Sequence, residues 1–268
     1  IGMCMSGHKT YVEIMFGDFI TNTIDQIVSN ASKFFHMYAK QISANVTIRT
    51  PMGGGRGYGP THSQSLEKIL FGIDNIAVFA VTSVINPENL ISFISALDCS
   101  NILIESKVDY GATLFQNSSL KALDINIIGG PAGSAVLSPW CKDSDKDALI
   151  ITYGLIGRMV ADNFEEIFER SDLLFDVFIL QQLNPIPIAH FENAARNSGK
   201  VLIIEESSAN FGWGSELAYQ LSELLPNIKI KRIGAKPVPI PSTRELEGEI
   251  LVDTVDIINA LNNLKDLV

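Results

Sequence analysis

Short segments rich in β-branched residues alternate with longer segments whose apolar residues recur at helical spacing, and this alternation runs through the chain twice. Strands that are apolar on both faces and are joined by helices belong to mostly parallel sheets that helices cover on both sides. The pattern therefore predicts an α/β fold. The first alternation predicts strands at 9–15, 45–50, 76–81 and 102–105, and helices at 18–40, 65–71 and 88–97. We expect a buried strand at 9–15 and one long helix with a broad apolar face over 18–40.

A stretch without regular spacing separates the two alternations. Glycine, proline, serine and charged residues dominate it, including GGPAG at 129–133 and DSDKD at 143–147. The second alternation predicts strands at 148–153, 175–180, 200–205 and 228–232, and helices at 157–170, 188–197, 213–225 and 252–264. Prolines 237, 239 and 241 predict an extended segment before the last helix. We predict two tandem α/β domains, at 1–111 and 148–268, with a linker at 112–147.

Charge and cysteine content exclude several classes of protein. The 268 residues carry 20 Lys plus Arg against 30 Asp plus Glu, and a net charge of −10 makes nucleic acid and anionic membranes poor partners. Three widely spaced cysteines form neither a disulfide framework nor a zinc motif, which favours the cytoplasm. No window reaches the roughly 18 apolar residues that span a bilayer, and the start lacks the layout of a signal peptide. The chain opens on Ile1 just before strand-like sequence, so we expect that an amino-terminal segment precedes it. A removed targeting segment would place the protein in an organelle matrix.

A glycine-rich run at 53–59 predicts a loop, because five glycines in seven residues cost too much backbone entropy in a helix or strand. It is not a dinucleotide fingerprint, since Tyr58 and Pro60 stand where glycine is required. It is not a P-loop either, because no glycine-lysine-serine or glycine-lysine-threonine closes it. The polar run PTHSQ at 60–64 follows, which favours a functional site over a simple turn.

His62 lies in that run, beyond the carboxyl end of the strand at 45–50, where ligands gather in open α/β sheets. An imidazole there can take up and release a proton during a reaction. A hydrogen-bonded structural histidine is the alternative, and it stays open. The other three histidines are isolated in the sequence, so we predict no metal site in this chain.

Two other motifs favour structural roles. Gly17 and Asp18 resemble the start of a Gly-Asp-Gly motif for magnesium and diphosphate, but Phe19 takes the third position. Ser134 and Ser215 follow glycines without the flanking pattern of a nucleophile elbow, and no aspartate and histidine pair follows either at a plausible place. A hydrolase triad is therefore unsupported.

Several runs together resemble the β subunit of the thiamine-diphosphate-dependent decarboxylating component of 2-oxoacid dehydrogenase complexes, of the pyruvate and branched-chain type. The runs are GHKTYVEIMFGDF at 7–19, IDQI at 24–27, NASK at 30–33, RTP at 49–51 and HSQSLE at 62–67. In the second domain they are EE at 205–206, FGWGSE at 211–216 and PIP at 239–241. The resemblance covers most of the chain, and the His-Ser-Gln run after the glycine loop is its most specific part.

The resemblance implies a transketolase-like pyrimidine-binding domain followed by a transketolase carboxy-terminal domain. It also implies that thiamine diphosphate lies between this chain and an α subunit, which binds the magnesium ion. By position, Met15 and Phe19 would pack against the aminopyrimidine ring, and His62 would stand near the reactive thiazolium carbon. In this family a glutamate before the first strand activates the cofactor, and Glu13 occupies a different position.

The implied function is oxidative decarboxylation of a 2-oxoacid, with transfer of the acyl group to a lipoyl-bearing acyltransferase. The chain would be active only with an α subunit, in an α₂β₂ heterotetramer. Two alternatives remain: the carboxy-terminal half of a split transketolase, and a non-catalytic structural or regulatory subunit. The His-Ser-Gln run at 62–64 favours the dehydrogenase over the transketolase. Presence of the upstream glutamate would favour catalysis over the structural role.

Overall fold

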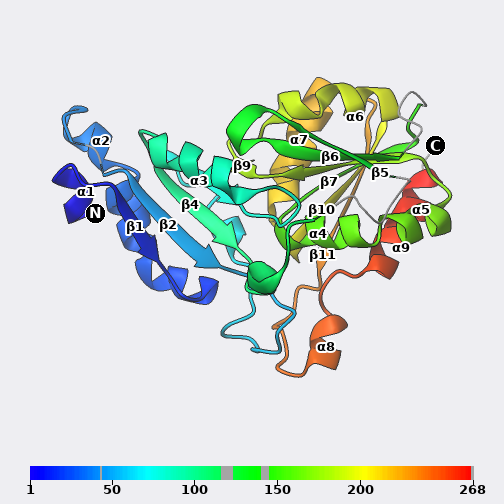
Figure 1. Cartoon of the computed structure of the whole chain (residues 1–268), viewed down its shortest axis with the longest axis horizontal. Helices are drawn as coiled ribbons and strands as arrows, with labels where there is room; N and C mark the ends of the chain where they lie inside the picture. The colour runs from blue at the N-terminus through cyan, green and yellow to red at the C-terminus, as the bar shows by residue number, and fades with distance from the viewer. Residues whose placement is uncertain (43, 116–122, 140–144, 267–268) are drawn as a thin grey trace.

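The computed structural model describes residues 1–42, 44–115, 123–139 and 145–266, and its two β-sheets lie side by side (Figure 1). The first sheet has five strands in the order β1-β2-β4-β3-β9. The strands are β1 (Thr10–Glu13), β2 (Val46–Pro51), β3 (Ile76–Ala80), β4 (Ser100–Glu105) and β9 (Gln182–Asn184). The first four are parallel and β9 is antiparallel. The prediction of two α/β domains is confirmed.

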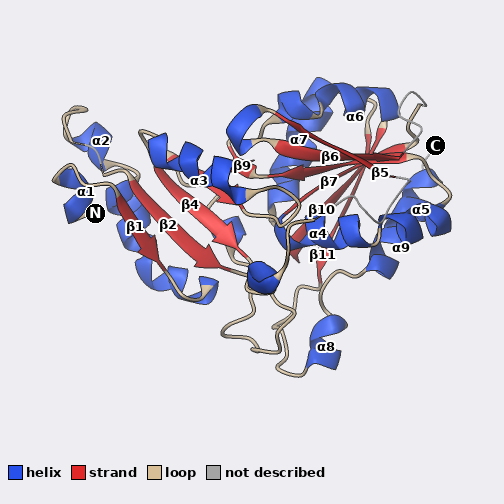
Figure 2. Ribbon diagram, viewed as in Figure 1, coloured by secondary structure: helices blue, strands red, loops and turns tan. Residues whose placement is uncertain are grey.

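The second sheet has six strands in the order β11-β10-β7-β8-β6-β5. They are β5 (Leu123–Ile128), β6 (Ser134–Pro139), β7 (Ala148–Tyr153), β8 (Phe175–Leu180), β10 (Lys200–Ser208) and β11 (Lys229–Ala235). Four of them, β7, β8, β10 and β11, run parallel. Helices cover both faces, with α6 and α7 on one side and α4, α5 and α9 on the other (Figure 2).

Part of the range 112–147, predicted as a linker, forms the edge of this second sheet. There β5 and β6 make an antiparallel hairpin, and β6 pairs with β8. The GGPAG run is the hairpin turn, in which Gly129 and Gly130 have φ of +80° and +78°. Turn residues and linker residues share the same composition, so the sequence pattern did not separate the two. Residues 116–122 and 140–144, including Cys141, lie outside the described residues.

A segment of the second half returns to the first sheet. Strand β9 pairs with β3, and Ala80 N–H donates to the Gln181 carbonyl at 2.8 Å. The Trp213 indole N–H donates to the Leu183 carbonyl at 3.0 Å. One buried apolar cluster includes Val78 of the first sheet together with Ile151 and Trp213 of the second half. The two domains therefore share a core.

The α-helices are short. They are α1 (Gly2–Met5), α2 (Phe34–Met37), α3 (Pro87–Ala96), α4 (Gly154–Asp162), α5 (Phe164–Ser171), α6 (Glu192–Ser198), α7 (Trp213–Leu224), α8 (Arg244–Gly248) and α9 (Thr254–Lys265). The predicted helix at 157–170 is interrupted at Asn163, and the one at 65–71 is only a 3₁₀ turn at Glu67–Ile69. Among the described residues, no helix has the length and apolarity to cross a membrane.

The single long helix predicted over 18–40 is wrong. The segment forms a 3₁₀ helix at Gly17–Thr23, a π-helix at Gln26–Ala31 and the short α2. The hydroxyls of Thr21 and Thr23 donate to the carbonyls of Asp18 and Ile20, both at 2.9 Å, and such local bonds compete with a regular helix. The predicted apolar face is right in part, because Ile20, Ile27 and Ala31 are buried, whereas Phe35 and Tyr38 are exposed.

The strand at 9–15 is an edge strand, which corrects the prediction that it is buried. Among the described strands, only β2 pairs with β1, and Tyr11 and Val12 are 48% and 39% exposed. β-branched and aromatic residues suit a strand at any place in a sheet, so they predicted the strand without predicting its exposure.

Candidate functional site

Aromatic rings gather at the carboxyl end of the first sheet. Phe16 follows β1, Phe19 lies in the 3₁₀ helix Gly17–Thr23, and His62 lies in the loop after β2. The His62 ring stands edge-on to Phe16 with ring centroids 4.5 Å apart, and it is 5.4 Å from Phe19. The structure thus brings together Phe19 and His62, which are 43 residues apart in the chain. Ligands of open α/β sheets bind at this end of the strands.

Three residues that the sequence did not single out complete the cluster. The Tyr58 ring lies 5.8 Å from Phe16, and Lys107 Nζ lies 3.4 Å from the centroid of the Phe16 ring. All of them follow neighbouring strands, because Phe16 comes after β1, Tyr58 after β2 and Lys107 after β4. The signal that could have found them is that adjacent parallel strands bring the residues after their carboxyl ends to one edge.

Met15, the third predicted site residue, lies between β1 and Phe16. Its side chain is 62% exposed. The thioether is therefore open to solvent, and it is available to a ligand or a partner chain rather than packed in the core.

Hydrogen bonds fix the turn that carries His62. The Thr61 hydroxyl lies 2.8 Å from His62 Nδ1, and the His62 N–H donates to the Gly59 carbonyl at 3.3 Å. The Gln64 side-chain amide donates to Asp18 Oδ1 at 2.8 Å and thereby joins this turn to the 3₁₀ helix of Phe19. Asp18 accordingly has a structural contact, which agrees with the structural role expected for the Gly17-Asp18 pair.

Acidic side chains lie beneath the glycine loop, at the junction of the domains. Glu67 is 1% exposed and accepts a hydrogen bond of 2.5 Å from the Tyr153 hydroxyl. Burial raises the pKa of Glu67, and burial also raises the pKa of Glu205, which pairs with Arg232 at 2.7 Å. Burial, assisted by the charge of Glu67, raises the pKa of Glu206 to about 8. Burial therefore disfavours the charged form of all three acids, and for Glu205 the ion pair with Arg232 opposes this effect.

Ser134 and His190 form a second contact that the sequence did not predict, with Ser134 Oγ 2.9 Å from His190 Nδ1. Burial lowers the pKa of His190. Ser134 is only 1% exposed, so its hydroxyl has no access to a substrate. An ideal Cβ at Gly129 would lie 2.1 Å from the imidazole, so the pair anchors the β5–β6 turn. The structure therefore offers no support for a hydrolase dyad.

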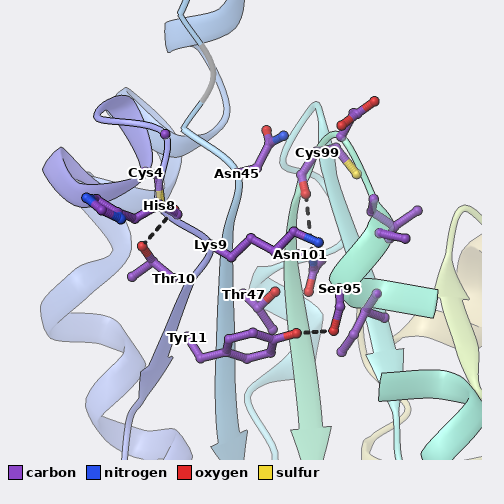
Figure 3. A pocket seen from close by; sticks show the side chains of 15 residues that line it. Cys4, His8, Lys9, Thr10, Tyr11, Asn45, Thr47, Ser95, Cys99 and Asn101 are labelled. Carbon is purple, nitrogen blue, oxygen red and sulfur yellow. Dashed lines mark hydrogen bonds between the residues drawn. The ribbon is translucent and has the colours of Figure 1, made fainter. Parts of the chain in front are cut away.

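A cavity of about 250 Å³ lies at the opposite end of the first sheet, at the amino ends of its strands (Figure 3). Lys9 extends across it in the figure, and the Tyr11 hydroxyl hydrogen-bonds Ser95. Asn101 donates from its side chain to the Cys99 carbonyl at 3.3 Å. The cavity contains none of the predicted site residues, and the strands separate it from His62.

The cluster offers one side of a site for a flat ring. Phe19 and Tyr58 are 38% and 42% exposed, so they present ring surface to a ligand, and His62 is only partly buried. Asp18 Oδ2 and Ser63 Oγ are buried without a hydrogen-bond partner beside the same turn. Within the described part of the chain, no group of three or more His, Cys, Asp and Glu side chains could hold a metal ion.

Comparisons with known proteins match two family models to successive parts of the chain. Residues 1–111 match the family model described as "Transketolase, pyrimidine binding domain", and residues 141–257 match "Transketolase, C-terminal domain". The chain is 24% identical over 266 residues to the pyruvate dehydrogenase E1 component subunit beta of Rhizobium meliloti, covering 97% of this chain and 55% of that protein. It is 25% identical over 270 residues to the 2-oxoisovalerate dehydrogenase subunit beta of Bacillus subtilis, covering 99% and 79%.

Among solved structures, the fold is similar to "Split gene transketolase, inactive beta4 tetramer". The TM-score is 0.74 at 20% identity, and the similarity covers 99% of this chain and 79% of that chain. This likeness concerns the fold. The chain spans about half the length of the Rhizobium relative, at 55%.

Proposed function

Since this chain belongs to the transketolase family and joins a pyrimidine-binding domain to a transketolase C-terminal domain, we propose that it is the β subunit of a thiamine-diphosphate-dependent 2-oxoacid dehydrogenase. The cluster of Phe16, Phe19 and His62 carries the proposal, because it sets a proton-handling group beside an exposed ring surface. The relatives named as β subunits of pyruvate and 2-oxoisovalerate dehydrogenases support the same class.

Each side chain has a role that its position allows. Phe19 and Met15, both exposed, would pack against the aminopyrimidine ring. His62 would move a proton at its imidazole, or meet the incoming lipoyl group, while Thr61 and the Phe16 ring hold its orientation. When bound, thiamine diphosphate supplies the carbon nucleophile and the electron sink for decarboxylation. The apolar rings lower the local dielectric, which favours the loss of charge as carbon dioxide leaves.

Positive charge at the rim of the cluster suits an anionic substrate. Lys107 lies over the Phe16 ring, and Arg56 donates to the Lys107 carbonyl at 2.6 Å. A 2-oxoacid carries a carboxylate, which these two cations attract although the chain as a whole has a net charge of −10.

The proposal includes partner chains. An α subunit would hold magnesium and the diphosphate group in an α₂β₂ assembly, and a lipoyl-bearing acyltransferase would receive the acyl group. The solved split-gene transketolase is described as an inactive β4 tetramer, and we propose that this chain is likewise inactive without α. We propose a cytoplasmic or organelle-matrix location, where the free thiols of Cys4 and Cys99 stay reduced.

Calorimetric titration of magnesium and thiamine diphosphate tests the proposal, with the chain alone and then mixed with a purified α-type chain. We expect binding only in the mixture. Phe19→Ala should weaken binding about tenfold, because ring contacts are worth roughly 1 kcal/mol each. His62→Ala should bind the cofactor normally but lose about 100-fold or more in turnover of the 2-oxoacid. Phe35→Ala, which removes a ring of similar exposure outside the cluster, is the matched control.

Three outcomes would contradict the proposal. Absence of binding in a mixture that still elutes as one complex would indicate a structural or regulatory subunit. Ketol transfer between sugar phosphates, without decarboxylation of a 2-oxoacid, would indicate the carboxy-terminal half of a split transketolase. Equal losses for Phe35→Ala and Phe19→Ala would show that the cluster is not the binding site.

A further inference from the structure

The glycine loop between β2 and His62 has no regular structure of its own. Backbone bonds tie its ends: Gly53 N–H donates to the Gln64 carbonyl at 3.2 Å, and the N–H groups of His62 and Ser63 donate to the Gly59 carbonyl at 3.3 and 3.1 Å. A loop of this composition needs contacts from elsewhere to hold one conformation. Those contacts come from the second domain, and Figure 1 shows the loop beside α8.

Glu206 of β10 supplies the first contact. Its carboxylate occupies the place of a side chain at Gly53, where an ideal Cβ would lie 1.8 Å from Oε1. The backbone of Gly54 hydrogen-bonds the same carboxyl group. Gly53 also has φ of +94°, a conformation that other residues rarely adopt. Glycine is therefore required at position 53 because a carboxylate from the other domain fills the space.

Glu247 of α8 supplies the second contact. It is 1% exposed, and its Oε2 accepts a hydrogen bond from Gly57 N–H at 2.7 Å. Its Oε1 lies close to Gly54, and a Cβ atom added at Gly54 would be only 2.9 Å from it. One buried carboxylate thus bonds the loop at Gly57 through Oε2, while its Oε1, which has no hydrogen-bond partner among the described residues, fills the space beside Gly54.

Glycine loops with open N–H groups usually bind phosphate or another anion. Here the anion-binding positions of Gly54 and Gly57 are already occupied by carboxyl groups of the same chain. We propose that Glu206 and Glu247 are positioning residues of the His62 site: they clamp the glycine loop from the second domain and thereby fix His62 against Phe16 and Phe19. The proposal rests on the proposed function only for its catalytic consequence.

Hydrogen exchange of the unmodified full chain is the first test, because it needs no variant. The amides of Gly54 and Gly57 should exchange at least about tenfold more slowly than the amide of Gly55, for which the described residues provide no acceptor. Equal exchange at the three glycines would overturn the clamp.

Variants provide the second test. Glu206→Ala and Glu247→Ala should move the imidazole NMR signals of His62 toward those of an unstructured histidine, because the ring shifts caused by Phe16 and Phe19 are lost. Glu206→Gln and Glu247→Gln should keep the native signals, since a side-chain amide oxygen still accepts the backbone N–H bond. Glu245→Ala, an exposed change on the same helix, is the matched control. Native His62 signals in folded Glu206→Ala and Glu247→Ala variants would refute the proposal.

With the α chain present, the Ala variants should lower kcat about tenfold or more and leave cofactor affinity within about twofold, while the Gln variants restore kcat. A loss of activity that the Gln variants do not restore would indicate that the carboxyl groups act in another way. If the unmodified protein shows no thiamine-diphosphate-dependent reaction, the proposed function fails. The exchange and NMR measurements then still decide whether the clamp exists.

Discussion

The Glu206 carboxyl group is protonated over much of the neutral range, because burial and the neighbouring Glu67 raise its pKa to about 8 from a usual value of 4.5. Between these two values the native state binds a proton that the unfolded chain has already released. Stability therefore falls as pH rises through this window, because ionisation stabilises the unfolded chain while the folded state keeps the proton. Below a pH of about 4.5, Glu206 is protonated in both the folded and the unfolded state, and its contribution to stability no longer changes with pH.

The expected result of Glu206→Gln is a weaker dependence of stability on pH between about 5 and 8, because the amide does not titrate. Relative to the unmodified chain, the variant should gain stability as pH rises. Urea unfolding at both ends of this range measures the difference, and Glu223→Gln, an exposed change on α7, is the control. If the stability of Glu206→Gln depends on pH in the same way as that of Glu223→Gln, the raised pKa does not belong to Glu206.

At the residue scale, sequence reasoning predicted site residues only where a motif is contiguous. Phe19 and His62 were identified because each lies in a characteristic run, and the structure places their rings 5.4 Å apart. Lys107 and Glu247 were missed, and Glu206 was noted only within the EE run at 205–206 without a role, because these residues reach the site from distant parts of the chain. No local pattern marks an acidic residue as the partner of a glycine 153 or more positions away.

At the scale of elements, the side chain of Arg49 links the three strands β1, β2 and β4, whose carboxyl ends lead to the site. Arg49 at the end of β2 donates to both carboxylate oxygens of Glu105 in β4, at 3.0 and 2.8 Å. The Tyr110 hydroxyl donates to the same carboxylate at 2.6 Å, and Glu13 of β1 lies 3.5 Å from Arg49. Charge from three adjacent strands is thus paired at the edge where the aromatic cluster begins.

Arg49→Leu should destabilise the protein by about 2 kcal/mol, because it leaves the largely buried Glu105 carboxylate without its charged donors. Adding Glu105→Gln should recover part of the loss, since an amide needs no counter-charge. Arg170→Leu, which breaks an exposed pair on one helix, should cost less than about 0.5 kcal/mol. Urea unfolding measures both losses. Equal losses of stability in Arg49→Leu and Arg170→Leu would show that the Arg49–Glu105 pair contributes no more than an exposed ion pair.

At the scale of the whole molecule, the two domains are not independent. Strand β9 completes the first sheet from within the second half of the chain, and Trp213 holds it through the Leu183 carbonyl. Lys68 adds bonds to the Ser208 hydroxyl at 2.7 Å and to the Asn210 carbonyl at 2.9 Å. The buried cluster around Trp213 includes residues of both sheets.

We expect one cooperative unfolding transition for both domains, and Trp213→Leu should destabilise them together by about 3 kcal/mol. Hydrogen exchange under mild denaturant measures this, because amides of β3 and β7 should then report the same free energy of opening. Loss of protection in β3 while β7 stays protected would show that the domains unfold separately.

The sequence by itself determined most of the local structure: the strands β1 to β4, β7, β8, β10 and β11, the glycine loop at 53–59, and the mostly parallel sheets. These features depend on propensities and apolar spacing over a few residues. Only the tertiary structure decided that β5 and β6 form a sheet edge within a supposed linker, that residues 18–40 break into short helices, and that β9 crosses back. Only the tertiary structure set Glu206 and Glu247 beneath the glycine loop. The physical reason is that pairing and burial depend on contacts between residues far apart in the chain, and short-range spacing carries no information about them.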